Sequence, residues 1–289
     1  MNNRYDNDKY PLVTVIVPVR NGEQTIDKLL SSLLSQDYPS DKTEIIIVDN
    51  GSQDQTLEMV KKYPVMLEKE NKTFSSYAAR NKGLSVANGE IIAFTDADCV
   101  PKQDWIREGV LALIEQNADM VGGKISFLLS DRPSAAELID SLTFMQNEQN
   151  IKNKQTAVTA NLFVRKELFN KLGLFEAVKS GGDFQWTHKA TRNSFSLIYA
   201  PNAIVYHPAR NLRQLLNKGR RIKTGTRSFV RILYAIIRLP VPIPSIRVLK
   251  LIIAIRGHYF FTVWSVSYLL QLNELLGLLL SLIFKTGKV

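Results

Sequence analysis

Short apolar runs that alternate with segments of helical periodicity constrain the fold of this chain more than any other feature. Residues 13–19, 44–48, 65–67 and 91–94 are short runs rich in β-branched or other apolar side chains. Helical spacing follows them: in residues 26–34 apolar side chains recur at i, i+3, i+4, i+7 and i+8. Continuous apolar runs are typical of parallel strands buried on both faces. The alternation predicts an α/β fold with a Rossmann-like, mostly parallel central sheet and helices on both faces.

Two aspartates, Asp96 and Asp98, follow directly after the run at 91–94. Open α/β sheets bind ligands at the carboxyl ends of their strands. Carboxylates at i and i+2 repel each other, and a divalent cation that prefers hard oxygen ligands, Mg²⁺ or Mn²⁺, would relieve that repulsion. The spacing alone leaves a second interpretation open, in which both acids cap the turn or the helix after Pro101.

The middle of the chain continues the same pattern with less regular spacing. Residues 106–114 keep helical periodicity, and a glycine pair before Asp183 places that carboxylate in the first turn of a helix that ends near residue 192. Residues 130–155 are polar and irregular, and we expect a helix with flexible flanks there. Further strands are expected at 120–127, 156–164 and 195–199.

Charge is distributed very unevenly along the chain. Residues 184–289 contain 16 Lys or Arg and one acid, whereas residues 1–183 contain 26 acids and 21 bases. Between residues 227 and 284 the basic side chains are interleaved with long apolar stretches, which suits a lipid interface better than the backbone of a nucleic acid. We expect a catalytic domain at 1–210 and a basic, apolar helical region at 211–289 that associates with a membrane surface and binds no nucleic acid.

The C-terminal region divides at about residue 257. Prolines interrupt residues 227–256, which favours an interfacial hairpin or two amphipathic helices. Residues 258–284 are long enough to span a bilayer, but Gln271, Asn273 and Glu274 lie at their middle, so a surface or re-entrant element is favoured over a full span.

The N-terminus and the cysteine content indicate the compartment. Residues 1–9 are polar and lack the apolar core of a secretory signal. The single cysteine, Cys99, excludes an internal disulfide. We therefore expect a cytoplasmic protein, peripheral or integral at the inner face of the cell membrane.

Five motifs in this order resemble the catalytic domain of a family-2 glycosyltransferase with the GT-A fold, within the nucleotide-diphospho-sugar transferase superfamily. The resemblance covers about residues 11–210. The motifs are Val15-Ile-Val-Pro-Val-Arg-Asn-Gly22, Ile46-Ile-Val-Asp-Asn-Gly-Ser52, Ala79-Arg-Asn-Lys-Gly83 with Asn88-Gly-Glu90, Phe94-Thr-Asp-Ala-Asp98, and Gly182-Asp183.

The resemblance implies a donor site at the ends of the first two strands. Pro18, Arg20 and Asp49 would line the nucleotide pocket, with Asp49 accepting a hydrogen bond from the base. An Asx-turn before Gly51 is the alternative role of Asp49. Arg80 is a candidate for a phosphate contact, since its planar fork suits phosphate oxygens. Its alternative role is a solvated charge on a helix.

The resemblance also implies a cation site and a catalytic base. Asp98 would hold the cation directly and Asp96 through the ribose or a water, and His207 would be a further metal ligand. Asp183 would be the base that takes a proton from the acceptor hydroxyl, or else a plain helix cap. The sequence departs from the family here, because Gly182 stands where a Glu often precedes the Asp.

These features favour an inverting, metal-dependent glycosyltransferase. It would move a sugar from a nucleotide-diphospho-sugar donor to a lipid-linked or polysaccharide acceptor at the cytoplasmic face of the membrane. Two alternatives stay open: a non-catalytic module that binds a partner or a membrane through its basic end, and a sugar-phosphate nucleotidyltransferase. The second would need a glycine-rich phosphate loop after the first strand, and residues 20–23 contain a single glycine.

Overall fold

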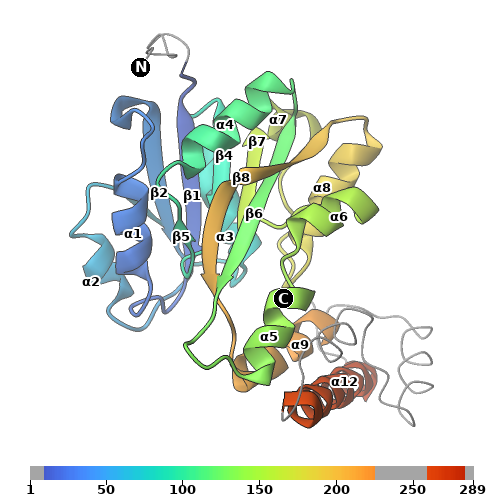
Figure 1. Ribbon diagram of the computed structural model, residues 1–289. Helices are drawn as coiled ribbons and strands as arrows, with labels where there is room; N and C mark the ends of the chain where they lie inside the picture. The colour runs from blue at the N-terminus through green and yellow to red at the C-terminus, as the bar shows by residue number, and fades with distance from the viewer. Residues whose placement is uncertain (1–9, 225–258, 284–289) are drawn as a thin grey trace. The chain divides into compact units, whose positions relative to one another are not determined.

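The computed structural model describes residues 10–224 and 259–283, which fold into two compact units (Figure 1). Of the described residues, the first unit comprises 10–126 and 146–207, and the second comprises 127–145, 208–224 and 259–283. The units are defined by packing, so the functional division at residue 210 stays a prediction. The interfacial element expected at 227–256 lies outside the described residues.

One eight-stranded sheet forms the centre of the fold, with the strand order β3-β2-β1-β4-β7-β6-β8-β5. β1 pairs in parallel with β2 and with β4, and β2 pairs in parallel with β3. The strands are β1 (Val13–Val19), β2 (Thr43–Asp49), β3 (Met66–Lys69), β4 (Ile91–Thr95), β5 (Val100–Pro101), β6 (Met120–Leu128), β7 (Asn161–Arg165) and β8 (Leu197–Pro208). The four runs that predicted the parallel part of the sheet are all confirmed as strands.

The prediction of a mostly parallel sheet is wrong, because the other half of the sheet is antiparallel. β7 runs antiparallel to β4 and to β6, and β5 runs antiparallel to β8. β8 is also longer than the strand expected at 195–199. Periodicity shows that a segment is a strand, but the direction of its neighbour depends on the path of the chain between them.

Helices lie on both sides of the parallel half, as predicted. Every residue of β1 is buried, which requires cover on both faces of the sheet. The helices of this unit are α1 (Ile26–Leu34), the short 3₁₀ helix η2 (Ser40–Lys42), α2 (Thr56–Val60), α3 (Ser76–Val86), α4 (Trp105–Glu115), α6 (Asn147–Lys154), α7 (Glu167–Leu172) and α8 (Gly182–Arg192). Buried leucines and one isoleucine give α1 the apolar face that its spacing predicted.

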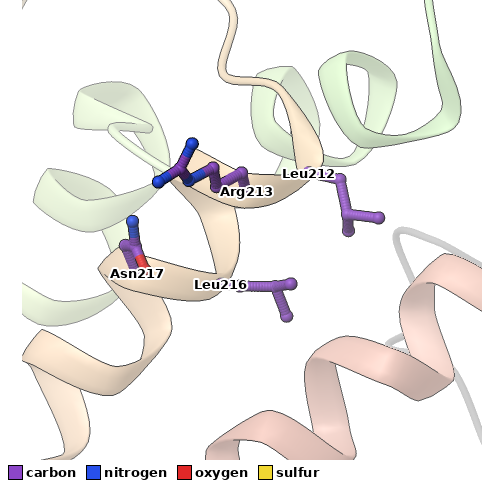
Figure 2. A pocket seen from close by; sticks show the side chains of 4 residues that line it. All are labelled: Leu212, Arg213, Leu216 and Asn217. Atoms are coloured by element: carbon purple, nitrogen blue, oxygen red, sulfur yellow. The ribbon is translucent and has the colours of Figure 1, made fainter.

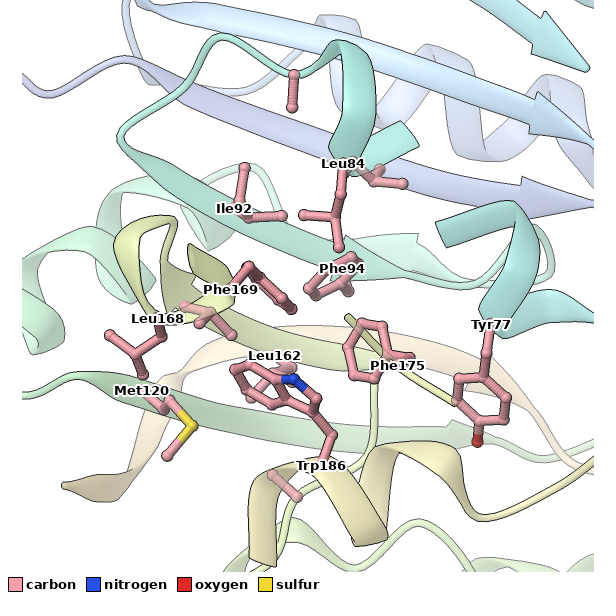
Figure 3. Close-up of a cluster of buried hydrophobic side chains, with 14 of the residues drawn as sticks. Tyr77, Leu84, Ile92, Phe94, Met120, Leu162, Leu168, Phe169, Phe175 and Trp186 are labelled. Carbon is pink, nitrogen blue, oxygen red and sulfur yellow. The ribbon is translucent and has the colours of Figure 1, made fainter. Parts of the chain in front are cut away.

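An aromatic cluster fills the space between the sheet, α3, α7 and α8 (Figure 3). Phe169 stacks on Trp186 with ring centroids 4.5 Å apart, and Phe175 packs 5.5 Å from Phe94 of β4. Tyr77 of α3 lies at the margin of this cluster, 5.9 Å from the Phe175 ring. Burial of side chains this large stabilises a fold by about 1.5–3 kcal/mol each, so the cluster fixes α3 and α8 on the sheet.

The segment before β7 is not the strand expected from residue 156. The backbone N–H groups of three successive residues here bond to side chains instead of a neighbouring strand. Ala157 donates to Thr187 (3.2 Å), Val158 donates to Asn147 (2.9 Å) and Thr159 donates to Asp183 (3.2 Å). β7 therefore begins only at Asn161.

The second unit is helical. It contains α5 (Ala135–Thr143), α9 (Leu212–Thr224) and α12 (Tyr259–Ile283), which share an apolar cluster of buried side chains: Ala135, Ala136, Ile139, Leu215, Val263 and Val266. The single helix expected within 130–155 is replaced by α5 and α6, which fall in different units. None of the helices in the described ranges combines the length and apolar content that crossing a membrane requires.

Buried Asp140 of α5 anchors Arg210 within this unit. The Arg210 backbone N–H donates to Asp140 at 2.9 Å, and its guanidinium lies 3.2 Å from both carboxylate oxygens. Because Asp140 is fully buried, the pair needs these several hydrogen bonds to offset its desolvation. The contact joins α5 to the start of the segment that leads into α9.

Candidate active site

The ends of β1 and β2, with the loops that follow them, hold Pro18, Arg20 and Asp49, which are predicted to bind the nucleotide. Asn21 N–H donates to Ser52 Oγ (2.9 Å), and Gln53 N–H donates to Asn21 Oδ1 (2.8 Å), so each loop holds the other. Pro18 lies opposite Val48 near the ends of both strands. Parallel pairing thus brings the two loops to one edge of the sheet, where ligands of open α/β sheets bind.

Asp49 ends β2 and is only 2% exposed. Its carboxylate accepts hydrogen bonds from the N–H groups of Gly51 (3.1 Å) and Ser52 (3.2 Å), which is the Asx-turn of the alternative interpretation. Arg20 is exposed, and its guanidinium carbon lies 4.8 Å from the centroid of the Phe74 ring. The role of these residues in donor binding stays a prediction.

Arg80 of α3 is buried and pairs with Asp96 after β4. Its Nη2 lies 2.5 Å from Asp96 Oδ1, and Nη1 donates to the Ser76 carbonyl at 3.3 Å. The Arg80 side chain is therefore not a solvated helix charge. Its Nε–H is buried and has no hydrogen-bond partner in the described part of the chain. A buried donor left unpaired is costly, and an anionic ligand could satisfy it.

Asp98, Cys99 and His207 converge on one point. The Asp98 Oδ2 and His207 Nε2 atoms are 3.4 Å apart, and one ligand atom from each of the three residues lies within 4.8 Å of the others. The pairing of Val100 with Tyr206 in the β5 and β8 ladder brings these distant positions together. His207 is almost fully buried, whereas the Asp98 side chain is 42% exposed, so the cluster opens on the Asp98 side.

Burial, and then the neighbouring carboxylates Asp98 and Asp96, raise the pKa of the Cys99 thiol well above its usual value. Sulfur is also a poor ligand for a hard cation, which prefers oxygen ligands. The atoms of this group that suit a hard cation are therefore a carboxylate oxygen of Asp98 and an imidazole nitrogen of His207. Asp96 lies outside this group of converging atoms, and its role as a metal ligand stays a prediction.

Asp183 lies in the first turn of α8, as predicted, and is 7% exposed. Oδ1 accepts hydrogen bonds from the Tyr77 hydroxyl (2.9 Å) and from Phe184 N–H (2.9 Å), and Oδ2 accepts one from Thr159 N–H (3.2 Å). Three donors from three parts of the chain hold this carboxylate in one orientation. A helix N-terminus also favours negative charge at this point.

One face of α3 holds the segment that leads to Asp183. Asn81 and Phe175 exchange two hydrogen bonds, from Asn81 Nδ2 to the Phe175 carbonyl (2.8 Å) and from Phe175 N–H to Asn81 Oδ1 (3.1 Å). Ser75, which caps α3, donates to the Val178 carbonyl at 2.8 Å. Tyr77 is four residues before Asn81, so its side chain lies on the same helix face.

Sequence reasoning did not find Tyr77 or Thr159. Burial, and then the Asp183 charge, raise the pKa of the Tyr77 hydroxyl well above its usual value, so it stays protonated and donates to Asp183. A single tyrosine in an otherwise ordinary helix gives no local signal, because Tyr77 and Asp183 are 106 residues apart. Thr159 contacts Asp183 through its backbone N–H, and the type of a residue does not predict a contact of its backbone.

The second unit contains an open pocket (Figure 2). It is lined by Leu212, Arg213, Leu216 and Asn217 of α9. None of the predicted site residues lines it, and it contains no carboxylate or imidazole that could act as a base. We assign the candidate active site to the strand ends of the first unit.

Comparison with known families and curated proteins identifies the family of this chain. The model of the family described as glycosyl transferase family 2 matches residues 14–173. Glycosyltransferase AglE of Haloferax volcanii is 40% identical over 221 residues, which cover 74% of this chain and 73% of AglE. Poly(ribitol-phosphate) beta-N-acetylglucosaminyltransferase TarS of Staphylococcus aureus is 34% identical over 113 residues, which cover 37% of this chain but only 20% of TarS.

Solved structures show the same fold. Mannosyltransferase PcManGT from Pyrobaculum calidifontis, in complex with GDP-Man and Mn²⁺, aligns with a TM-score of 0.58 at 22% identity and covers 96% of this chain and 76% of its own. TarS 1-349 in complex with UDP-GlcNAc aligns with a TM-score of 0.54 at 23% identity and covers 76% of this chain and 68% of its own. At these identities the likeness concerns the fold alone.

Proposed function

The chain belongs to glycosyltransferase family 2, and we propose that it transfers a sugar from a nucleotide-diphospho-sugar donor with inversion at the anomeric carbon. We propose a lipid-linked or polysaccharide acceptor at the cytoplasmic face of a membrane. One observation carries the proposal: the same unit holds one buried, oriented carboxylate, Asp183, and a separate carboxylate and imidazole pair, Asp98 and His207.

Asp183 is suited to the role of base because it is held but not neutralised by a charged partner. Its hydrogen bonds come from a hydroxyl and two backbone N–H groups, and no ion pair with it is present among the described residues. In the proposed step the acceptor oxygen forms a bond to the anomeric carbon and gives its proton to Asp183. The bond from that carbon to the phosphate oxygen breaks, and the nucleoside diphosphate leaves with the electron pair.

The residues present fit a divalent cation. Asp98 and His207 supply one oxygen and one nitrogen, and the open side at Asp98 leaves room for donor phosphates and water, which Mg²⁺ and Mn²⁺ usually retain as ligands. Asp98 and His207 would hold the ion, and Asp96 would act next to them. A bound cation stabilises the charge of the departing diphosphate.

The donor is proposed from the loops after β1 and β2 and from the structural relatives. Pro18, Arg20 and Asp49 lie on these loops or at their strand ends, and Arg80 has an unused buried N–H. The neighbours named above bind GDP-Man with Mn²⁺ and UDP-GlcNAc. A uridine or guanosine diphospho-sugar is therefore the first donor class to test.

A membrane-bound acceptor is proposed from charge and exposed apolar surface. Residues 184–289 hold 16 of the 37 basic residues and one acid. On α12, Phe261 is 73% exposed and Leu269 and Leu276 are each 46% exposed. A strongly basic sequence region that also presents exposed apolar side chains on α12 fits an anionic lipid surface. A phosphate-rich polymer acceptor, as the name of TarS indicates for that protein, would use the same positive charge.

Thermal shift with nucleotides tests the donor and the cation together. The full chain is heated with UDP, GDP, dTDP or CDP, each with and without Mn²⁺. We expect one nucleotide to raise the melting temperature only when Mn²⁺ is present. At a hundredfold excess of nucleotide over its Kd, binding adds about 2.7 kcal/mol to the free energy of unfolding. A shift that is equal with and without Mn²⁺ would contradict the metal dependence, and no shift with any nucleotide would contradict the donor class.

Vesicle flotation tests the membrane surface. We expect the protein to float with phosphatidylglycerol vesicles at low salt and to stay behind with phosphatidylcholine vesicles, because surface charge attraction is screened by salt and absent without anionic lipid. Equal flotation with both vesicles would assign the binding to apolar insertion alone. Flotation with neither would contradict the membrane part of the proposal.

A further inference from the structure

We propose that Tyr77 is the residue that positions Asp183 for proton transfer. The inference rests on the proposed function, in which Asp183 is the base. Tyr77 belongs to none of the motifs that identify the family, and it approaches the site from a different helix. Its hydroxyl donates to Asp183 Oδ1 at 2.9 Å, and both side chains are buried.

Gly182 explains why the tyrosine can reach the carboxylate. A Cβ atom added to Gly182 would lie 3.0 Å from two carbons of the Tyr77 ring and 3.1 Å from a third. A side chain at position 182 would therefore press on the ring, which would have to give by a few tenths of an ångström. The Tyr77 ring occupies the space that a side chain at position 182 would need. Glycine at this position therefore leaves the ring free to contact Asp183.

The tyrosine is held rigidly enough to orient its partner. Its ring packs 5.9 Å from the Phe175 ring, and Phe175 is itself tied to α3 by two hydrogen bonds with Asn81. Burial and the Asp183 charge keep the phenol protonated, so it acts as a hydrogen-bond donor. The carboxylate oxygens accept from Tyr77 on one side and from Thr159 on the other.

Arg80 connects this arrangement to the cation side of the site. Its guanidinium carbon lies 5.4 Å from the centroid of the Tyr77 ring, at a distance where a cation and an aromatic face attract each other. The same guanidinium binds Asp96. The helix α3 therefore contacts the acid after β4 through Arg80 and the candidate base through Tyr77.

The test compares Tyr77→Phe with a matched control, Tyr38→Phe. Tyr38 is also a buried tyrosine of the first unit, and its hydroxyl donates to the Pro11 carbonyl at 2.7 Å, with no contact to Asp183. Both variants lose one buried phenol hydrogen bond and keep the ring. The rate of hydrolysis of UDP-GlcNAc or GDP-Man in the presence of Mn²⁺ is measured as the release of nucleoside diphosphate. Calorimetric titration with UDP or GDP counts the competent binding sites.

We expect kcat per competent site to fall about 10- to 100-fold in Tyr77→Phe, since small misplacement of a catalytic group has effects of this size. KM for the donor should stay within about twofold, because a base that meets the nucleophile contributes little to donor binding. Tyr38→Phe should keep kcat per site within about twofold. A merely structural Tyr77 would lower the number of competent sites and leave kcat per site unchanged, which would overturn the inference.

A second variant tests the shared space. Gly182→Ala should lower kcat per site in the wild-type background, because its methyl group displaces the Tyr77 ring, and should add little in the Tyr77→Phe background, where the hydroxyl is already absent. Full additivity of the two losses would overturn the link between these positions. A wild-type protein that binds none of UDP, GDP, dTDP and CDP, with or without Mn²⁺, would overturn the proposed function, and the inference with it.

Discussion

The two carboxylate sites of the first unit differ in exposure and in partners. Asp98 is 42% exposed and faces an imidazole nitrogen, whereas Asp183 is 7% exposed and accepts from one hydroxyl and two backbone N–H groups. A partly open carboxylate beside a nitrogen ligand suits a cation that must also bind donor oxygens. A closed carboxylate oriented by neutral donors suits a base. The surroundings of the two aspartates therefore favour the two different roles that we propose for them.

The largest expected effects separate these two roles. Asp183→Ala should lower transfer by about 10²- to 10⁴-fold, the range over which general acid–base groups contribute. Asp98→Ala should also lower transfer strongly, because the proposed cation would lose its carboxylate ligand. Only Asp98→Ala should also remove the Mn²⁺-dependent thermal shift with nucleotide. Equal loss of donor binding in both variants would show that the two sites are not distinct, and Tyr38→Phe is the control for folding.

A smaller effect is expected from His207 on the cation side. His207→Ala should weaken the apparent Mn²⁺ affinity by about tenfold, or 1.4 kcal/mol, because one ligand is lost and Asp98 remains. Titration of Mn²⁺ at a fixed nucleotide concentration measures this change. An unchanged Mn²⁺ midpoint would remove His207 from the ligand set and leave it as a hydrogen-bond partner of Asp98.

Alkaline unfolding sharpens the comparison on the base side. The pKa of the Tyr77 hydroxyl is raised by burial and by Asp183, so above about pH 10 the unfolded chain loses this proton while the folded chain keeps it. Stability should therefore fall as pH rises from about 10, and Tyr77→Phe should show a shallower fall. Urea midpoints at pH 8 and pH 11 give the two slopes, and parallel slopes in wild type and variant would contradict the burial of an un-ionised Tyr77.

The smallest effect is expected outside both sites, at Glu137 of the second unit. Hydrogen bonds from the N–H groups of Ser134 and Ser130 lower the pKa of Glu137 to about 2 as part of the capping box of α5. Its contribution is present above about pH 4.5 and is lost as pH falls toward 2. Glu137→Gln keeps the hydrogen-bond acceptor but cannot titrate. Between pH 6 and pH 3 the free energy of unfolding should therefore fall less in this variant than in the wild type, with a difference below about 1 kcal/mol.

Local pattern was enough to predict the parallel half of the sheet and the placement of single acids. The β-branched run of β1 and the leucine spacing of α1 each lie within one element, where periodicity reports burial directly. The glycine pair before Asp183 likewise predicted a carboxylate at a helix start. In each case the residues that decide the outcome are close together in the sequence.

Tertiary structure decided the direction of the other strands and the partners of the acids. The path of the chain between β4 and β7, and not their composition, made that pair antiparallel. The ladder of β5 and β8 placed His207 beside Asp98, and the packing of α3 placed Tyr77 beside Asp183 over 106 residues of sequence. The physical reason is that hydrophobic periodicity records which side of an element is buried, whereas the identity of the contacting neighbour depends on how separate elements pack together.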